Sequence, residues 1–162
     1  MKDRIGRRGA GVLACMIAGG LAIALGARVG AEATLRLPHD EPAAVAAGAT
    51  LYAEHCAACH GAALEGQVAD WRQTGPDGLM PAPPHDETGH TWHHPDMLLF
   101  EITARGTEAV VGGGYRSNMP GFGDVLTDSE ILAVLGFIKS TWPEEIRTIH
   151  DRINADAARY AD

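Results

Sequence analysis

One group of residues has types and spacing that point to a specific chemistry, the run Cys56-Ala57-Ala58-Cys59-His60. A bare C-x-x-C pair serves either in thiol redox chemistry or as half of a zinc site. The redox pair belongs near a βαβ alternation, which this sequence lacks, and the zinc site needs further ligands, whereas no cysteine follows Cys59. The histidine directly after the second cysteine completes C-x-x-C-H, the signature for attachment of a c-type haem.

The motif assigns a role to each of its three reactive side chains. Two thiols one helical turn apart add to the two vinyl groups of the porphyrin, and the adjacent imidazole becomes the proximal iron ligand. We therefore predict that Cys56 and Cys59 hold the haem covalently and that His60 binds the iron. The predicted cofactor is one haem c.

The residues before the motif predict a helix from Pro42 to about His55. Proline is favoured at the first helical position, and the acidic residues just before it suit the positive end of a helix. Gly48 lies inside this helix, where glycine costs about 1 kcal/mol relative to alanine. It therefore either has a packing reason, shared with Tyr52 on the same face, or merely reflects a Gly-rich composition.

The pattern Gly48-x-x-x-Tyr52-x-x-x-Cys56-x-x-Cys59-His60-Gly61 resembles the N-terminal helix and haem motif of class I monohaem cytochromes c. The resemblance implies an all-α fold, the cytochrome c fold of about four helices around a covalently bound haem. In that family this helix crosses the C-terminal helix at its glycine. An aromatic residue from each helix packs at the crossing.

A matching C-terminal helix is predicted after residue 126. Its start is the capping box Thr127-Asp128-Ser129-Glu130, in which the threonine hydroxyl and the glutamate carboxylate satisfy opposite backbone amides. The next eight residues, 131–138, are apolar on all sides, as in a buried helix. Phe137 is expected to supply the second aromatic ring of the crossing.

A low-spin electron carrier needs a second axial ligand, and a methionine thioether raises the reduction potential. Met119 stands in a Gly-rich loop directly before a proline, and this Met-Pro pair resembles the axial methionine of the family. Met97 falls on a helical pattern, 96–105, that Gly106 ends, and we predict that it belongs to the core. Met80 lies in a proline-rich loop and stays open as an alternative, but we predict Met119 as the ligand.

Between the haem motif and that helix, residues 67–95 form a loop insertion rich in proline and histidine. In the family, a proline carbonyl in this stretch accepts the Nδ1 proton of the proximal histidine and orients its ring. The resemblance makes three prolines candidates for this partner, and the sequence does not choose among them. They are Pro81, Pro83 and Pro84.

The four histidines of the insertion admit two interpretations. They either form a second site for copper or zinc with Asp86 nearby, or they line a solvated loop, bind the haem propionates or cap the helix that starts near Pro95. A capping or propionate-facing role suits His93 and His94, which directly precede that helix. We favour the second interpretation. The four are His85, His90, His93 and His94.

Residues 143–162 predict an additional amphipathic helix at the C-terminus. Pro143 is followed by two acidic residues, which suits a helix start. Apolar residues then recur at helical spacing. They are Ile146, Ile149, Ile153, Ala157 and Tyr160. The helix either packs back on the domain, which we favour, or docks on a larger membrane complex.

The N-terminus predicts export. Four basic residues precede nineteen small or apolar ones, 9–27, so residues 1–31 are either a cleaved signal peptide or an N-terminal membrane anchor. A linker at 32–41 then leads to the cytochrome c domain at 42–142. The predicted location is periplasmic, with 9–27 as the candidate transmembrane helix that tethers the chain to the inner membrane.

The charge balance bounds the partners. The chain has 162 residues, with 13 basic and 21 acidic ones and a net charge of −8. The first 31 residues hold five basic and one acidic, so the remainder has eight basic against twenty acidic residues, a net charge of −12. This argues against nucleic-acid binding through a basic face. The expected partners are redox proteins, in membrane respiratory or oxidoreductase complexes, that dock through basic patches or apolar contact.

Together these features predict an electron carrier rather than an enzyme in its own right, in which a haem ligated by His60 and Met119 passes single electrons between redox partners. Two alternatives stay open. If Met119 does not bind, an open sixth site would handle peroxide or a gas, as an enzyme or a sensor. A metal-handling protein would instead use the histidine-rich loop. Membership of a larger oxidoreductase also stays open.

Overall fold

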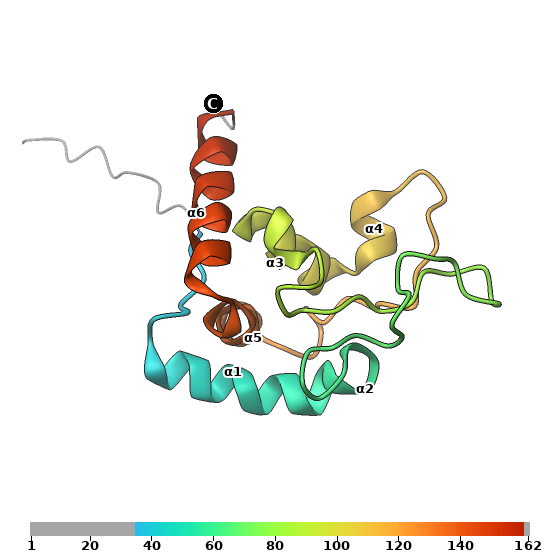
Figure 1. Cartoon of the computed structure of the whole chain (residues 1–162), viewed down its shortest axis with the longest axis horizontal. Coiled ribbons are helices and arrows are strands. Elements are labelled where there is room, and N and C mark those ends of the chain that lie inside the picture. The colour runs from blue at the N-terminus through green and yellow to red at the C-terminus, as the bar shows by residue number, and fades with distance from the viewer. Residues whose placement is uncertain (1–34, 161–162) are drawn as a thin grey trace, which may run out of the picture. The chain divides into compact units, whose positions relative to one another are not determined.

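The computed structural model describes residues 35–160, and all regular structure in that range is helical (Figure 1). This confirms the predicted all-α class. The elements are α1 (Pro42–His55), α2 (Ala57–His60), the 3₁₀ helix η1 (Thr91–His93), α3 (Asp96–Arg105), α4 (Thr107–Val111), α5 (Asp128–Thr141) and α6 (Glu144–Arg159). The predicted export or anchor segment lies outside the described residues. No helix in residues 35–160 has the length and apolar character needed to cross a membrane.

Helices α1 and α5 cross at the centre of the core, with α5 seen end-on above α1 in Figure 1. Gly48 is buried at the crossing, where a Cβ atom would overlap with the backbone carbonyl of Ala133. The rings of Tyr52 and Phe137 pack beside it with their centroids 5.5 Å apart. The predicted crossing is confirmed, and the close backbone approach is the packing reason for the glycine.

Helix α5 begins with the predicted capping box. The Thr127 hydroxyl accepts a hydrogen bond from Glu130 N at 3.3 Å, and the Glu130 carboxylate accepts one from Thr127 N at 2.8 Å. Apolar side chains on most sides of the helix are buried, as its composition predicts. They include Ile131, Val134, Leu135 and Ile138.

Helix α3 presents one face to the core. Its buried residues are Asp96, Leu99 and Thr103, which share a face because successive residues turn by about 100° around the axis. Met97 follows Asp96 and therefore points away from that face, with 53% of its surface exposed. The prediction that Met97 belongs to the core is wrong.

Helix α6 packs back on the domain, as predicted. His150 is fully buried, and its Nε2 donates a hydrogen bond to the carbonyl of His94 at 2.9 Å. Lys139, at the end of α5, is also buried and pairs with Asp151 at 2.6 Å. The predicted apolar stripe is shorter than expected, because α6 ends at Arg159 and Tyr160 is 90% exposed.

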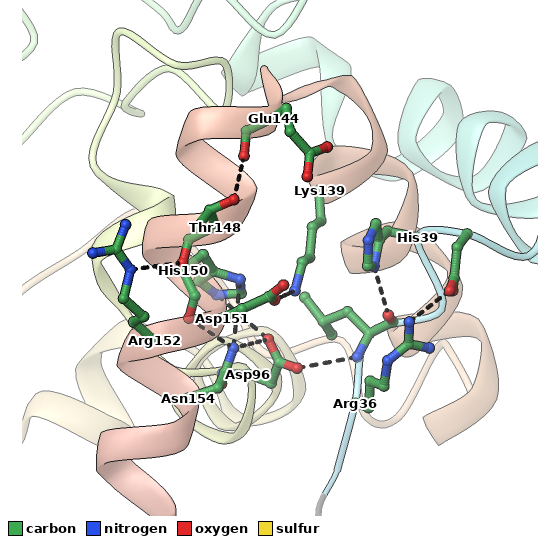
Figure 2. A network of polar contacts seen from close by, with 12 residues as sticks. Arg36, His39, Asp96, Lys139, Glu144, Thr148, His150, Asp151, Arg152 and Asn154 are labelled. Carbon is green, nitrogen blue, oxygen red and sulfur yellow. Dashed lines mark hydrogen bonds and ion pairs between the residues drawn. The ribbon is translucent and has the colours of Figure 1, made fainter.

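A side chain from α6 caps the start of α3. The Asn154 Oδ1 atom accepts a hydrogen bond from Asp96 N at 2.7 Å, and its Nδ2 atom donates to Asp96 Oδ1 at 3.1 Å (Figure 2). The other Asp96 oxygen accepts a hydrogen bond from Leu37 N at 3.1 Å. The first amide of α3 thus has its partner from α6, and the interpretation of His93 or His94 as the cap is wrong.

Candidate functional site

The two thiols lie where α1 gives way to α2. Cys59 N donates to the Cys56 carbonyl at 3.1 Å, so one tight turn separates the cysteines. Both are free, with Cys56 half-buried and Cys59 exposed. Burial, and then the neighbouring Cys59, raise the pKa of Cys56 to about 11. At neutral pH the Cys56 side chain is therefore a protonated thiol.

His60 ends α2 with its ring buried and hydrogen-bonded. Its Nδ1 atom lies 2.8 Å from the carbonyl oxygen of Pro83. Because a carbonyl accepts but cannot donate, Nδ1 carries the proton and Nε2 keeps its lone pair. Burial lowers the pKa of His60, although the bond to Pro83 opposes this. A neutral imidazole with a free Nε2 is the form that binds a metal ion.

Two backbone segments bring Pro83 to His60. Gln67 N donates to the Ala82 carbonyl at 2.9 Å, and Ala82 N donates back to Gln67 Oε1 at 3.1 Å. Since Gln67 lies seven residues after His60, this pairing fastens the proline run beside the haem motif. Among the three candidate prolines, Pro83 is the one whose carbonyl oxygen accepts the hydrogen bond from the His60 ring, whereas the Pro84 carbonyl packs against Gly89. Pro81 is half-buried at the start of the same run.

His85 lies directly against the His60 ring, a contact that the sequence analysis missed. The two rings stack with centroids 3.9 Å apart and planes 21° apart. The His85 Nδ1 atom lies 2.8 Å from Thr91 Oγ1, and the Trp142 Nε1 atom donates to the His85 carbonyl at 2.7 Å. Burial lowers the pKa of His85 well below its ordinary value. No spacing rule marks this histidine, apart from its place two residues after Pro83.

The other loop histidines are engaged with aromatic rings. His90 stacks on Trp71 with ring centroids 4.9 Å apart, and His94 packs edge to face with His90 at a centroid distance of 5.3 Å. His93 packs edge to face with Trp92 at a centroid distance of 3.6 Å. Within residues 35–160, no three His, Cys, Asp or Glu side chains lie close enough together to hold a metal ion.

Met119 is half-buried in a loop that is fastened to the end of α3. Phe122 N donates to the Thr103 carbonyl and Gly123 N donates to the Ala104 carbonyl, both at 2.9 Å. Carbonyls in the last turn of a helix have no partner within the helix, so these bonds satisfy α3 and hold the loop together. Phe122, three residues after Met119, is therefore held in place by its hydrogen bond to helix α3.

A glycine lets the Met119 loop approach α3 closely. Gly106 has φ +85°, and a Cβ atom there would press on the backbone of Pro120 and Gly121. A cavity of about 430 Å³ lies beside Met119 and is lined from the end of α3, α4 and the loop. The alternative ligand, Met80, is exposed, and its sulfur accepts a hydrogen bond from a threonine of its own loop at 3.7 Å.

The described residues thus provide two groups of donors. The haem motif supplies two thiols and a neutral imidazole on adjacent turns, with Pro83 and His85 around the ring. The second group is the Met119 thioether in its fastened loop. The chemistry of this donor set fits a covalently attached haem, because soft thiols, imidazole and thioether are the groups that hold haem c and its iron. An all-helical domain with this set belongs to the covalent haem proteins.

Comparison with known families agrees. The family model described as Cytochrome c matches residues 45–142, more than half of the chain. The chain belongs to the cytochrome c family, whose members carry covalently attached haem c, transfer electrons and generally work outside the cytoplasm. The matched range ends at Trp142, two positions before the first residue of α6. Neither the curated proteins nor the solved structures gave a match.

Proposed function

We propose that this protein carries single electrons between redox partners through one haem c, held by Cys56 and Cys59 and ligated by His60 and Met119. The observation that carries the proposal is the 2.8 Å contact between His60 Nδ1 and the Pro83 carbonyl. It leaves Nε2 free on the residue that directly follows Cys59 and lies one turn after Cys56. The fastened Met119 loop supports the choice of the second ligand.

The mechanism follows from the way in which the fold restrains the two proposed iron ligands. Haem c, when bound, supplies a one-electron iron couple. Pro83 orients the proximal imidazole, and the bonds from Phe122 and Gly123 to α3 hold the Met119 loop. Ligands fixed in this way need little movement when the charge of the site changes. One-electron transfer requires no general acid, base or nucleophile, so the proposal assigns none and treats the protein as a carrier.

The same proposal covers domain organisation and location. Residues 42–142 are the cytochrome c domain, with the 67–95 insertion and the additional helix in 143–162. Residues 1–31 direct the chain to the periplasm, and 9–27 are either removed or kept as a tether to the inner membrane. The family's extracytoplasmic setting and the basic start of the chain support this.

Partners are proposed from charge. The net charge of −12 beyond residue 31 favours redox proteins with basic patches, since complementary charge speeds association. Apolar contact around the haem edge would add to this. A membrane respiratory or oxidoreductase complex that presents such a surface is the proposed class of partner, and the protein acts either free or as a subunit of it.

Optical spectra of methionine variants test the ligand set. The ferric protein should be low-spin and show the weak red charge-transfer band that thioether ligation gives. Met119→Leu should abolish this band and lower the reduction potential, because a thioether ligand raises it. Met80→Leu and Met97→Leu are matched controls that should keep both.

Each contrary outcome has a definite meaning. Loss of the band in Met80→Leu but not in Met119→Leu would transfer the ligand role to Met80. A high-spin wild-type protein without the band would overturn the carrier proposal and favour an open site for peroxide or a gas. The pyridine haemochrome spectra of Cys56→Ser and Cys59→Ser, each expected to keep one thioether bond and one unreacted vinyl group, check the covalent sites.

A further inference from the structure

We infer that His85 is a positioning residue that fixes the ring plane of His60. The inference deepens the proposed function and rests on its assignment of His60 as the proximal iron ligand. His85 itself makes no contact with the iron in this proposal. Its effect is exerted through the stacked ring of its neighbour.

The hydrogen bond from His60 to Pro83 fixes one point of the imidazole but not its plane. A single N–H···O bond at 2.8 Å tolerates rotation of the ring about the line that joins the two atoms. A second flat ring at 3.9 Å, with its plane within 21°, opposes that rotation because a turned ring would collide with it. Pro83 and His85 together therefore set both the direction and the plane of the His60 ring.

His85 can act as a fixed wall because it is held on several sides. Its Nδ1 lies 2.8 Å from the hydroxyl of Thr91, which is buried. Its backbone amide donates to the Leu64 carbonyl at 2.8 Å, and its carbonyl accepts from Trp142 Nε1 at 2.7 Å. The ring of Tyr52 lies edge-on at 6.1 Å. These contacts come from four separate segments, so the ring has little freedom.

The ring plane of an axial imidazole has an electronic consequence. The ligand π orbital overlaps with different iron d orbitals as the ring turns, so the plane controls how unpaired spin spreads over a ferric haem. Partners around a ligating histidine orient the ring and tune the metal in just this indirect way. Loss of the wall should therefore change the magnetic signature of the ferric protein while iron ligation persists.

The test uses the haem-loaded protein with two substitutions at one position. His85→Ala removes the wall, whereas His85→Phe keeps a flat ring and loses the bond to Thr91. We expect His85→Ala to change the order and spread of the haem methyl resonances in the ferric NMR spectrum and to shift the EPR g values. His85→Phe should stay close to wild type.

A matched control separates positioning from stability. Asn154→Ala removes the α6 cap on α3 and should lower the melting temperature without changing the methyl pattern, because it contacts neither His60 nor His85. The inference is overturned if His85→Ala keeps the wild-type pattern, or if Asn154→Ala changes it as much. Should His85→Ala not fold, His85→Leu replaces the flat ring with a non-planar side chain, and a wild-type methyl pattern there would equally overturn the inference.

Failure of the proposed function gives a different result. In that case the wild-type protein itself would lack the low-spin spectrum of histidine and methionine ligation. If wild type and variants all keep that spectrum but share one methyl pattern, the carrier proposal stands and the role of His85 falls.

Discussion

The buried histidine of α6 shows how one residue can make stability depend on pH. His150 Nε2 donates to the His94 carbonyl, while Nδ1 lies 3.5 Å from the Asn154 Nδ2 donor and must accept. The neutral ring satisfies both contacts, whereas a second ring proton would face a donor. Burial, and then Lys139, lower the pKa of His150, although Asp96 at 3.4 Å opposes this and Asp151 does so more weakly.

We predict that the protein loses stability as the pH falls below about 6.5, the ordinary pKa of histidine. Because the native pKa of His150 is lowered, the unfolded chain binds more protons in this range, and the free energy of unfolding must fall. Stability from this residue is complete above the unfolded pKa and is lost as the pH falls through the native one.

Denaturant unfolding of the haem-loaded protein between about pH 7.5 and pH 5 measures this slope. His150→Gln, which can still donate to the His94 carbonyl, should flatten it, although His85 adds a further contribution because its pKa is also lowered. Thr148→Ala, at an exposed position of the same helix, is the control, because it removes no titratable group. An equal slope in wild type and His150→Gln would refute the assignment.

At the scale of helices, replacing Gly48 by alanine at the α1–α5 crossing would have two opposing effects on stability. Alanine would favour the helical conformation by about 1 kcal/mol. Its Cβ atom would, however, overlap with the backbone carbonyl of Ala133, which cannot rotate away as a side chain can. Overpacking of a close contact costs about 1–3 kcal/mol, and an overlap with fixed backbone atoms belongs at the upper end of that range, so the steric cost exceeds the gain in helix propensity.

Gly48→Ala should therefore lower the free energy of unfolding by up to about 2 kcal/mol, the overpacking cost less the gain in helix propensity. The denaturant midpoint measures it. Ala47→Ser, at the exposed neighbouring position of α1, serves as the control and should change stability by less than about 0.5 kcal/mol. A more stable Gly48→Ala protein would contradict this prediction, because it would mean that α1 and α5 can move apart to accommodate the Cβ atom without loss of stability.

The sequence predicts helices better than it predicts the contacts between their side chains. Helix α1 and the capping box of α5 have local signals, a proline start and a Thr-x-x-Glu spacing, so their positions follow from neighbouring residues. The stack of His85 on His60 and the cap of Asn154 on Asp96 join residues 25 and 58 positions apart. No local pattern encodes such pairs, because tertiary packing alone brings them together.

The wrong prediction for Met97 and the open choice among the three prolines have the same origin, because both depend on tertiary packing. Met97 fits the helical pattern of α3, but the pattern fixes a period and not which face turns inward. The choice of Pro83 among three prolines likewise depends on the pairing of Gln67 with Ala82, which brings that carbonyl to the ring. The identity of the motif residues needed no such information, since C-x-x-C-H is contiguous.

For the whole molecule, charge governs which reagents approach the haem. The residues after position 31 carry a net charge of −12, before any contribution from haem propionates. Attraction between exposed charges weakens as salt shortens the Debye length from about 30 Å at 0.01 M to about 10 Å at 0.1 M. Rates of electron exchange should therefore respond to salt with a sign that depends on the reagent.

We predict that oxidation of the ferrous protein by a cationic cobalt–phenanthroline complex slows as ionic strength rises, because screening removes an attraction. Oxidation by ferricyanide, an anion, should accelerate over the same range. Stopped-flow measurement at the haem absorption band follows both reactions. Salt dependence of one sign with both reagents would show that the net charge does not control access.

The α1–α5 crossing also has a kinetic consequence. Gly48 and Ala133 touch although they are 85 positions apart in the chain, and the haem motif, the insertion and the Met119 loop all lie between them. Closing a loop of that length costs about 4 kcal/mol of chain entropy beyond a constant term. The entire candidate site therefore lies within the chain segment that the contact between Gly48 and Ala133 closes. Refolding is therefore expected to be slower than in helical bundles whose contacts are local.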